Sequence, residues 1–131
     1  MRYKNPPIGV IGIIVKGRNV LCSIRNIPPG KGKLDLVGGF VEVGESLEDA
    51  LKREIKEELG VRTTSLQYFT SAPSNYGTRV LLAVHFTCRI QGTPRISTEL
   101  RKIMWINKTP NDMAFESDRQ ALKKYFKNLQ S

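Results

Sequence analysis

Three glutamates, Glu54, Glu57 and Glu58, stand close together in the middle of the chain, the last two being three and four residues after the first. On a helix, residues at that spacing share one face, so these carboxylates would crowd together. Like charges held so close are destabilising unless a cation lies between them. Carboxylate oxygens are hard ligands that suit Mg²⁺ or Mn²⁺, ions that also bind phosphate oxygens. The spacing predicts a divalent-metal site; the alternative is a solvated glutamate-rich face supported by neighbouring lysines and arginines.

A helix from about Ser46 to Leu59 would carry these glutamates. Residues 46–49, Ser-Leu-Glu-Asp, have the form of a capping box, and Gly60 is a typical residue just past a helix end. Apolar residues recur every four positions and would face the core; they are Leu47, Leu51, Ile55 and Leu59. The glutamates lie beside this stripe, so their carboxylates would emerge at the edge of the core, where unneutralised charge is most costly.

The rest of the chain is typical of strands separated by turns. A β-branched run predicts a strand at 8–15, and a hairpin turn at 16–19 leads to an alternating strand at 20–25. The further strands are predicted at 34–37, 64–72, 79–90 and 103–106, and the loops between them at 26–33, 72–77, 91–98 and 107–112. An amphipathic helix is predicted at 117–129. Strands flanked by two helices predict an α/β sandwich with a largely covered sheet.

The chain's 131 residues predict one domain over residues 1–131. Its net charge of +9 is unevenly spread, because residues 42–58 carry seven acidic and three basic side chains while the remainder carries five acidic and eighteen basic ones. A basic body would draw anionic ligands toward an acidic patch that holds a cation; solubility alone is the alternative reason for the charge. The basic residues are scattered with no run of five, so a nucleic-acid-binding stripe is not indicated.

The cysteines and the start of the chain favour a reduced, cytoplasmic protein. Cys22 and Cys88 lie in strand-like runs without CxxC spacing, which favours buried thiols over a disulfide or thiol catalysis. The apolar stretch at 8–15 is too short to span a bilayer, and no small-residue cleavage site accompanies it.

Residues 39–61 resemble the Nudix signature at every specified position. Gly39 is followed after five residues by Glu45, and after seven more by the run Arg53-Glu-Ile-Lys-Glu-Glu-Leu-Gly-Val61. The signature covers 23 of 131 residues. The resemblance implies a Nudix-type α/β/α sandwich with a mixed, curved β-sheet between helices. It also implies hydrolysis of a nucleoside diphosphate linked to another group, by water attack at phosphorus, with Mg²⁺ or Mn²⁺.

The resemblance implies a role for each matching residue. Glu57 and Glu58 would be the principal metal ligands. Glu54 would bind metal directly or through the attacking water, and the backbone carbonyl of Gly38 would be a further ligand. Arg53 would orient a catalytic glutamate through a charge-assisted hydrogen bond.

Other implied roles fall outside the metal cluster. Glu45 resembles the structural acid at the loop-to-helix junction. Arg25 occupies a position that often faces substrate, although an ordinary surface strand residue is an equal alternative. For the distal general base or extra ligand, Glu99 is the first candidate and Glu116 the second, each weighed against a plain surface acid. His85, alone in mid-strand, is interpreted as non-catalytic.

Leu34 and Val37 stand where the family usually has Trp and Pro, which puts a base-stacking or loop-shaping role in doubt. The aromatic candidates for stacking on a base, weighed against simple packing, are Tyr3, Phe40, Phe69 and Tyr76. Of these we expect Phe40 and Tyr76 to bind substrate.

Residues 69–76 and 114–117 resemble the branch of ADP-ribose and NADH pyrophosphatases, while a tyrosine near position 76 also marks dinucleoside-polyphosphate hydrolases. We therefore expect a small nucleotide substrate such as ADP-ribose. The alternatives are a nucleoside triphosphate, as in a sanitising enzyme, the 5′ end of RNA, and a binding module that senses a nucleotide without cleaving it. Retention of every signature glutamate argues against the last. No membrane partner is expected, and a homodimer is left open because many members of the family are dimers.

Overall fold

The computed structural model describes residues 5–96 and 100–130. In chain order the elements are β1 (Ile8–Lys16), β2 (Asn19–Arg25), β3 (Leu34–Asp35), β4 (Val37–Phe40), α1 (Leu47–Leu59), β5 (Arg62–Tyr76), β6 (Arg79–Gln91), β7 (Leu100–Ile106) and α2 (Glu116–Leu129).

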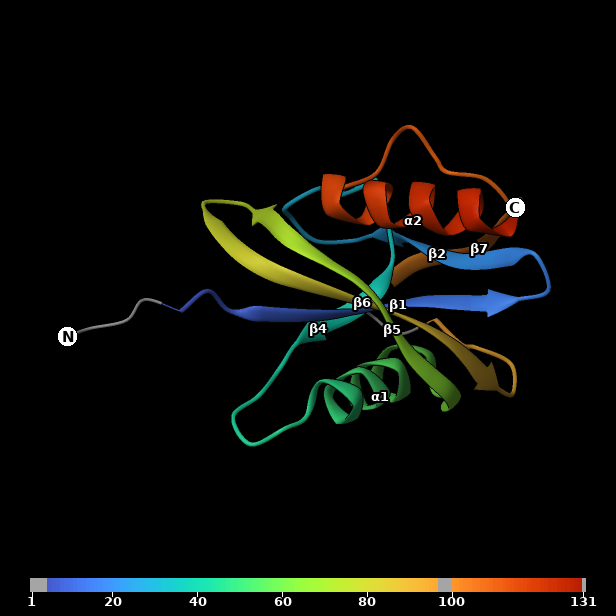
Figure 1. Ribbon diagram of the computed structural model, residues 1–131, viewed down its shortest axis with the longest axis horizontal. Coiled ribbons are helices and arrows are strands. Elements are labelled where there is room, and N and C mark those ends of the chain that lie inside the picture. The colour runs from blue at the N-terminus through green and yellow to red at the C-terminus, as the bar shows by residue number, and fades with distance from the viewer. Residues whose placement is uncertain (1–4, 97–99, 131) are drawn as a thin grey trace.

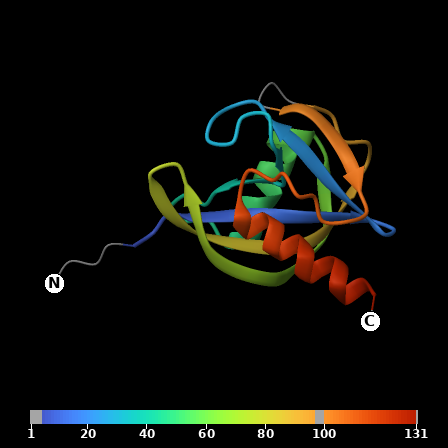
Figure 2. The same cartoon turned by 90° about the horizontal axis from the view of Figure 1, so that it is seen from above.

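The strands form a mixed sheet in the order β3-β2-β1-β6-β5, with β4 also paired to β1 and β7 to β2. β1 runs parallel to β6, from the pair Ile8–Leu82 to the pair Ile14–Cys88. The first half of β1 also pairs with β4, whereas only its last two residues pair with β2. Because β1 changes partners along its length, the sheet is strongly curved, and β2 and β7 run at a steep angle to β1 (Figure 2).

The two helices cover opposite faces of this sheet (Figure 1). Val10 and Ile14 of β1 belong to the core on the α1 side, and Ile13 to the core on the α2 side, as expected for alternating side chains of one strand. All three are fully buried. The predicted α/β/α sandwich with a mixed, curved sheet is confirmed.

Helix α1 begins and ends where its sequence signals predict. The hydroxyl of Ser46 accepts a hydrogen bond from the backbone N–H of Asp49 at 3.0 Å. Gly60 has a φ of 70°, the left-handed conformation of a helix cap, and its N–H donates to the carbonyl of Lys56. The apolar stripe is buried at Leu51, Ile55 and Leu59. This packing fixes the rotation of the helix and hence the direction of its glutamate face.

The predicted loop at 72–77 is wrong, because β5 continues to Tyr76 and the chain turns only at residues 77–78. The Pro-Ser-Asn composition of this stretch favours a loop, but Pro73 pairs with Leu82 in a strand at the edge of the sheet. An edge strand tolerates proline because its second side needs no hydrogen-bond donor. As a result, Tyr76 is held at the end of a strand.

Cys22 and Cys88 are both buried and free, as predicted. Burial raises the pKa of each thiol to about 12, so neither forms the thiolate that catalysis requires. Within the described residues, no helix is both long and apolar enough to cross a membrane.

Candidate active site

A cavity of about 400 Å³ is lined by residues from both helices and from the strands between them. From α1 it receives Glu54, Glu57 and Glu58. From α2 and the residue before it, the cavity receives Phe115, Ser117 and Asp118. Because the helices lie on opposite faces of the sheet (Figure 1), we distinguish an α1 end, rich in carboxylates, from an α2 end. The strands contribute Gly38, Gly39, Phe40, Arg25, Asp35 and Tyr76.

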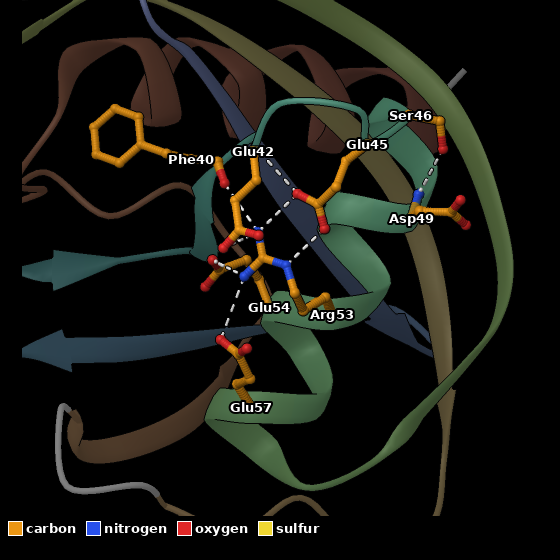
Figure 3. Close-up of polar contacts among 8 residues, drawn as sticks. All are labelled: Phe40, Glu42, Glu45, Ser46, Asp49, Arg53, Glu54 and Glu57. Atoms are coloured by element: carbon orange, nitrogen blue, oxygen red, sulfur yellow. Dashed lines mark hydrogen bonds and ion pairs between the residues drawn. The ribbon is translucent and has the colours of Figure 1, made fainter.

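At the α1 end, Arg53 connects the helix to the preceding loop (Figure 3). Its Nε and Nη2 donate to both carboxylate oxygens of Glu45, at 2.7 and 3.0 Å. Nη2 also donates to the carbonyl of Phe40 at 3.0 Å, and Nη1 donates to Glu54 at 2.8 Å. A longer contact of 3.4 Å reaches Glu57. Arg53 thus holds one signature glutamate and lies beside a second.

Glu45 fastens the loop before α1. It receives the two hydrogen bonds from Arg53, and its Oε1 accepts a further one from the backbone N–H of Glu42 at 2.8 Å. These bonds favour the ionised form, and they lower the pKa of Glu45 to about 2. Glu45 therefore lies at the loop-to-helix junction, where its carboxylate is bonded to Arg53 and to the backbone of Glu42.

The double glycine of β4 lets the strand approach Glu54 closely. A Cβ atom on Gly39 would collide with the carboxylate of Glu54, and one on Gly38 would collide with the backbone of Val10 in β1. Any side chain at these positions would therefore displace either the glutamate or the neighbouring strand. The absence of side chains brings main-chain groups of β4 next to the carboxylates of α1.

This set of donors fits Mg²⁺ or Mn²⁺. Carboxylate and main-chain carbonyl oxygens are the ligands that these hard cations prefer. Among the residues that the structure describes, no three acidic, histidine or cysteine side chains converge as a preformed metal site. Carboxylates at this spacing repel one another, and the side chain of Glu57 is 60% exposed.

At the α2 end, Arg25 is bonded into the wall of the cavity. Nη1 donates to Asp35 at 2.7 Å, Nε to the carbonyl of Pro29 at 2.7 Å, and Nη2 to the hydroxyl of Tyr76 at 3.3 Å. The guanidinium also lies 5.0 Å from the ring centre of Phe115. Only 12% of the Arg25 side chain is exposed, which rules out an ordinary surface position.

Aromatic rings form another part of this end. Tyr76 stacks on Phe115 with ring centres 5.3 Å apart, and Phe40 meets Tyr76 edge-on at 5.6 Å. The structure thus brings together Phe40 and Tyr76, both predicted to bind substrate. Phe69 packs against Tyr125 and does not line the cavity. The stacking candidate Tyr3 lies outside the described residues.

Sequence reasoning missed Asp35, Asp118 and Phe115. Burial, followed by the negative charge of Asp118, raises the pKa of Asp35 to about 8, although Arg25 opposes this effect. A visible signal existed for each acid, because Asp35 interrupts a short apolar strand and Asp118 falls on the buried side of α2 together with Ala121 and Leu122. Charged residues at such positions are almost never fully buried without a partner.

The two candidates for a distal acid have different outcomes. Glu99 lies outside the described residues. Glu116 begins α2, accepts a hydrogen bond from Gln120 at 2.7 Å and does not line the cavity. His85 is buried against Asp118 and does not line the cavity either.

The family model of the NUDIX domain matches residues 5–129 of this chain. This chain belongs to the Nudix family. The Nudix domain described here is 49% identical over 59 residues to an ADP-ribose pyrophosphatase of Methanocaldococcus jannaschii, a match that covers 45% of this chain and 35% of that protein. It is 36% identical over 95 residues to a mitochondrial NAD(P)H pyrophosphatase of Homo sapiens, covering 71% of this chain and 26% of that protein.

A third relative is the NAD-capped RNA hydrolase NudC of Vibrio vulnificus, 42% identical over 52 residues, which cover 40% of this chain and 20% of that protein. The matches thus span well under two thirds of these relatives. Among solved structures, a MutT NUDIX hydrolase from Burkholderia pseudomallei superposes with a TM-score of 0.82 at 24% identity, covering 92% of this chain and 98% of that one. A MutT protein from Methanosarcina mazei superposes with a TM-score of 0.81 at 20% identity, covering 99% and 100%. These likenesses support the fold.

Proposed function

We propose that this Nudix domain hydrolyses the pyrophosphate bond of a nucleoside diphosphate linked to a second group, with Mg²⁺ or Mn²⁺, and that the substrate is a small nucleotide such as ADP-ribose. One observation carries the proposal: a single cavity joins the three carboxylates of α1 to an end lined by aromatic rings and Arg25. A diphosphate with a cation fits the first end, and a planar group fits the second.

The names of the relatives support the choice of substrate. Their printed activities are those of an ADP-ribose pyrophosphatase, an NAD(P)H pyrophosphatase and an NAD-capped RNA hydrolase. ADP-ribose and the NAD group share an adenosine whose diphosphate joins a second ribose. This common part is the smallest substrate that is consistent with the printed activities of all three relatives.

In the proposed mechanism the glutamates of α1 and the backbone of β4 have separate tasks. Glu57, Glu58 and the carbonyl of Gly38 would hold the cation, and Glu54, fixed by Arg53, would hold the cation or orient the attacking water. The bound cation would stabilise negative charge on the phosphate oxygens and lower the pKa of a bound water. Glu99 is the proposed base that takes the water proton.

The chemical step breaks one anhydride bond. The water oxygen attacks one phosphorus atom, the bond from that phosphorus to the bridging oxygen breaks, and the bridging oxygen leaves with the other phosphate. ADP-ribose would thus yield AMP and ribose 5-phosphate. Arg53 keeps Glu54 in place throughout, because its other donors are bound to Glu45 and to the Phe40 carbonyl.

A substrate panel tests this function. Purified protein is incubated with Mg²⁺ or Mn²⁺ and with ADP-ribose, NADH, a dinucleoside polyphosphate, nucleoside triphosphates, NAD-capped RNA and 5′-triphosphate RNA, and products are separated by chromatography. We expect AMP from ADP-ribose, at a higher kcat/KM than for any triphosphate. If the protein hydrolyses none of these compounds, the proposal is contradicted. The same assay tests Glu99. If turnover by Glu99→Gln protein falls less than threefold below that of wild type, Glu99 is not the base.

The RNA arms of the panel have their own reason. The net charge of +9 would attract a polyanion, and one relative is named for NAD-capped RNA. If capped RNA is cleaved with a much higher kcat/KM than ADP-ribose, RNA is the preferred substrate of the same site.

A further inference from the structure

A second hollow of about 410 Å³ lies on the sheet face that α2 covers. Helix α2 crosses the strands at an angle (Figure 2), and alternate side chains of β6 point toward it. In chain order along that face, Leu81 and Ala83 line the cavity, His85 packs against α2, and Thr87 and Arg89 line the second hollow. No described residue lines both spaces. The helix thus separates the second hollow from the candidate active site.

Two cross-strand pairs of β5 and β6 form the floor of the second hollow. Ser65 lies opposite Arg89, and Gln67 lies opposite Thr87; all four residues line the hollow. Side chains of directly opposed residues on one face lie about 5 Å apart. Tyr125 of α2 forms a wall beside them. The fold therefore gathers a guanidinium, an amide and hydroxyl groups in one small space.

Arg89 gives the second hollow a positive charge that is not neutralised locally. None of the described residues that line the hollow is acidic, and Arg89 forms no ion pair with any other described residue. Burial raises the pKa of the Tyr125 hydroxyl, and the charge of Arg89 opposes this rise. Tyr125 therefore stays protonated at neutral pH and can donate a hydrogen bond.

A second cation borders the hollow. The ammonium group of Lys124 lies 4.9 Å from the ring centre of Phe69, and that ring packs edge-on against Tyr125 at 6.0 Å. Positive charge from β6 and from α2 thus converges on the same side of the sheet. Such a site favours an anionic ligand.

The groups that line the second hollow match a phosphate that carries a hydroxylated body. The planar fork of a guanidinium binds two phosphate oxygens at once. Neutral hydroxyl and amide groups both donate to and accept from the hydroxyls of a sugar. We propose that the second hollow binds a small sugar phosphate, with the phosphate on Arg89 and the sugar hydroxyls on Gln67 and Tyr125. This site is independent of the proposed function, because it uses neither the glutamates of α1 nor a divalent cation.

The size and lining of the hollow favour a small ligand over a nucleic-acid strand. A volume of about 410 Å³ is typical of a site for one small molecule. A single strand is bound along a continuous basic groove, with successive bases stacked on aromatic rings. The described lining of this hollow contains one arginine and one aromatic ring, Arg89 and Tyr125.

The test is an NMR titration of ¹⁵N-labelled protein with glucose 6-phosphate, inorganic phosphate and glucose, without divalent metal and at constant ionic strength. We expect amide shifts to concentrate around Ser65, Gln67 and Arg89, and glucose 6-phosphate to bind more tightly than either of the other compounds. Arg89→Gln should weaken its binding at least about tenfold, because a hydrogen bond to a charged donor is lost. Arg79→Gln is the matched control: it removes the same charge from an exposed position at the other end of β6, outside the hollow, and should change the affinity less than twofold.

Gln67→Ala tests the sugar end of the site. The Gln67 side chain is exposed, so its truncation should leave the fold intact. We expect weaker binding of glucose 6-phosphate and unchanged binding of inorganic phosphate, because only the sugar contact is removed. Equal losses for both compounds would contradict the assignment of Gln67 to the sugar.

Several results would overturn the inference. They are no binding of glucose 6-phosphate to wild-type protein, shifts confined to the cavity, and an affinity that Arg89→Gln leaves unchanged. Sodium chloride that reproduces the same shifts would show general screening of charge. Binding of a single-stranded RNA in the absence of any binding of glucose 6-phosphate would show a polyanion surface instead. The first two results are read on wild-type protein, and none of them depends on hydrolysis of any substrate.

Discussion

At the scale of single residues, Arg53 is the side chain on which the α1 end depends most. It bonds to Glu45, Glu54 and the Phe40 carbonyl, so it links the helix, the preceding loop and the end of β4. Its side chain is 24% exposed, which leaves these charge-assisted hydrogen bonds partly screened from solvent. A lysine could not replace it, because an ammonium group lacks the planar fork that binds both oxygens of Glu45.

We predict that Arg53→Ala lowers the free energy of unfolding by about 1–3 kcal/mol, because several bonds to a charged donor are lost. It should also lower kcat more than it raises KM, because Glu54 is released. Urea unfolding and steady-state kinetics measure the two effects. The control is Lys52→Ala, at an exposed neighbour, which should change stability by less than about 0.5 kcal/mol. Arg53→Ala protein as stable and active as the control would refute this role.

Glu45 makes stability depend on pH in the acid range. Its pKa is about 2 in the folded protein, below the usual value of 4.5, chiefly because Arg53 bonds to the carboxylate. A carboxyl group whose pKa is lower in the folded than in the unfolded protein stabilises the fold at pH values above its unfolded pKa. This contribution disappears as the pH falls through its folded pKa. The difference in unfolding free energy between wild type and Glu45→Gln should therefore be full above about pH 5 and shrink toward pH 2. A difference that stays constant across a urea series at pH 2–6 would contradict the assignment.

The three glutamates of the proposed metal site are predictable from the sequence because one helix carries all of them and their spacing is a local property. The α2 end was not predictable in the same way. Asp35, Asp118 and Phe115 meet only after the chain has folded, and a charged residue inside an apolar pattern shows that a partner exists without showing which one. The sequence indicates Arg25 as a candidate, but its bonds to Pro29, Asp35 and Tyr76 form only because folding brings β2 together with β3 and β5.

At the scale of elements, the important feature of β4 is the absence of side chains at Gly38 and Gly39. Its two glycines let the strand lie against both β1 and the glutamates of α1. The two positions differ in what an added methyl group would meet. At Gly39 it would meet the carboxylate of Glu54, the end of a side chain that can move, and at Gly38 it would meet the backbone of Val10, which cannot.

The two alanine substitutions should therefore separate activity from stability. Gly39→Ala should reduce turnover by at least about tenfold while changing the unfolding free energy by less than about 1 kcal/mol, because Glu54 swings aside. Gly38→Ala should lower the unfolding free energy by about 1–3 kcal/mol or more, as in an overpacked core. Each variant serves as the control for the other, with turnover and urea unfolding measured on both. If the two variants lower the unfolding free energy equally, leaving room for the carboxylate of Glu54 is not the role of Gly39.

Sequence signals were sufficient for α1 and insufficient for β5. The ends of α1 follow from Ser46 and Gly60, because capping is decided by neighbouring residues. The end of β5 is decided by pairing with β6, which outweighs the turn propensity of Pro73 and its neighbours. The last residues of β5, which the sequence predicts as a loop, hold Tyr76 in the wall of the cavity.

At the scale of the whole molecule, charge is divided in a way that suits a metal-bound anion. The chain carries a net charge of +9, yet residues 42–58 contain seven of its twelve acidic side chains. The acidic segment includes α1, which lies on one side of the sheet (Figure 1). The remaining residues carry eighteen basic and five acidic side chains. A cation bound at the glutamates would remove their mutual repulsion and leave a site that attracts phosphate groups.

Metal binding should therefore stabilise the whole fold. A metal concentration ten times the dissociation constant adds about 1.4 kcal/mol to the unfolding free energy, which raises the melting temperature of a domain of this size by a few degrees. Thermal melts with millimolar Mg²⁺ or Mn²⁺ measure this, and sodium chloride at matched ionic strength controls for general screening of the +9 charge. Equal shifts with the divalent and monovalent salts would argue against a specific site.

The most direct test of the account is the turnover of ADP-ribose by Glu57→Gln and Glu58→Gln at saturating Mg²⁺ or Mn²⁺. Each variant removes one charge from the proposed metal site and keeps the shape of the side chain. We predict that kcat/KM falls at least about a hundredfold in both, since electrostatic stabilisation of several kcal/mol depends on the cation. The melting temperature without metal should stay the same or rise, because one like charge is removed. If both variants retain activity within threefold of wild type, the glutamates of α1 do not hold a catalytic metal.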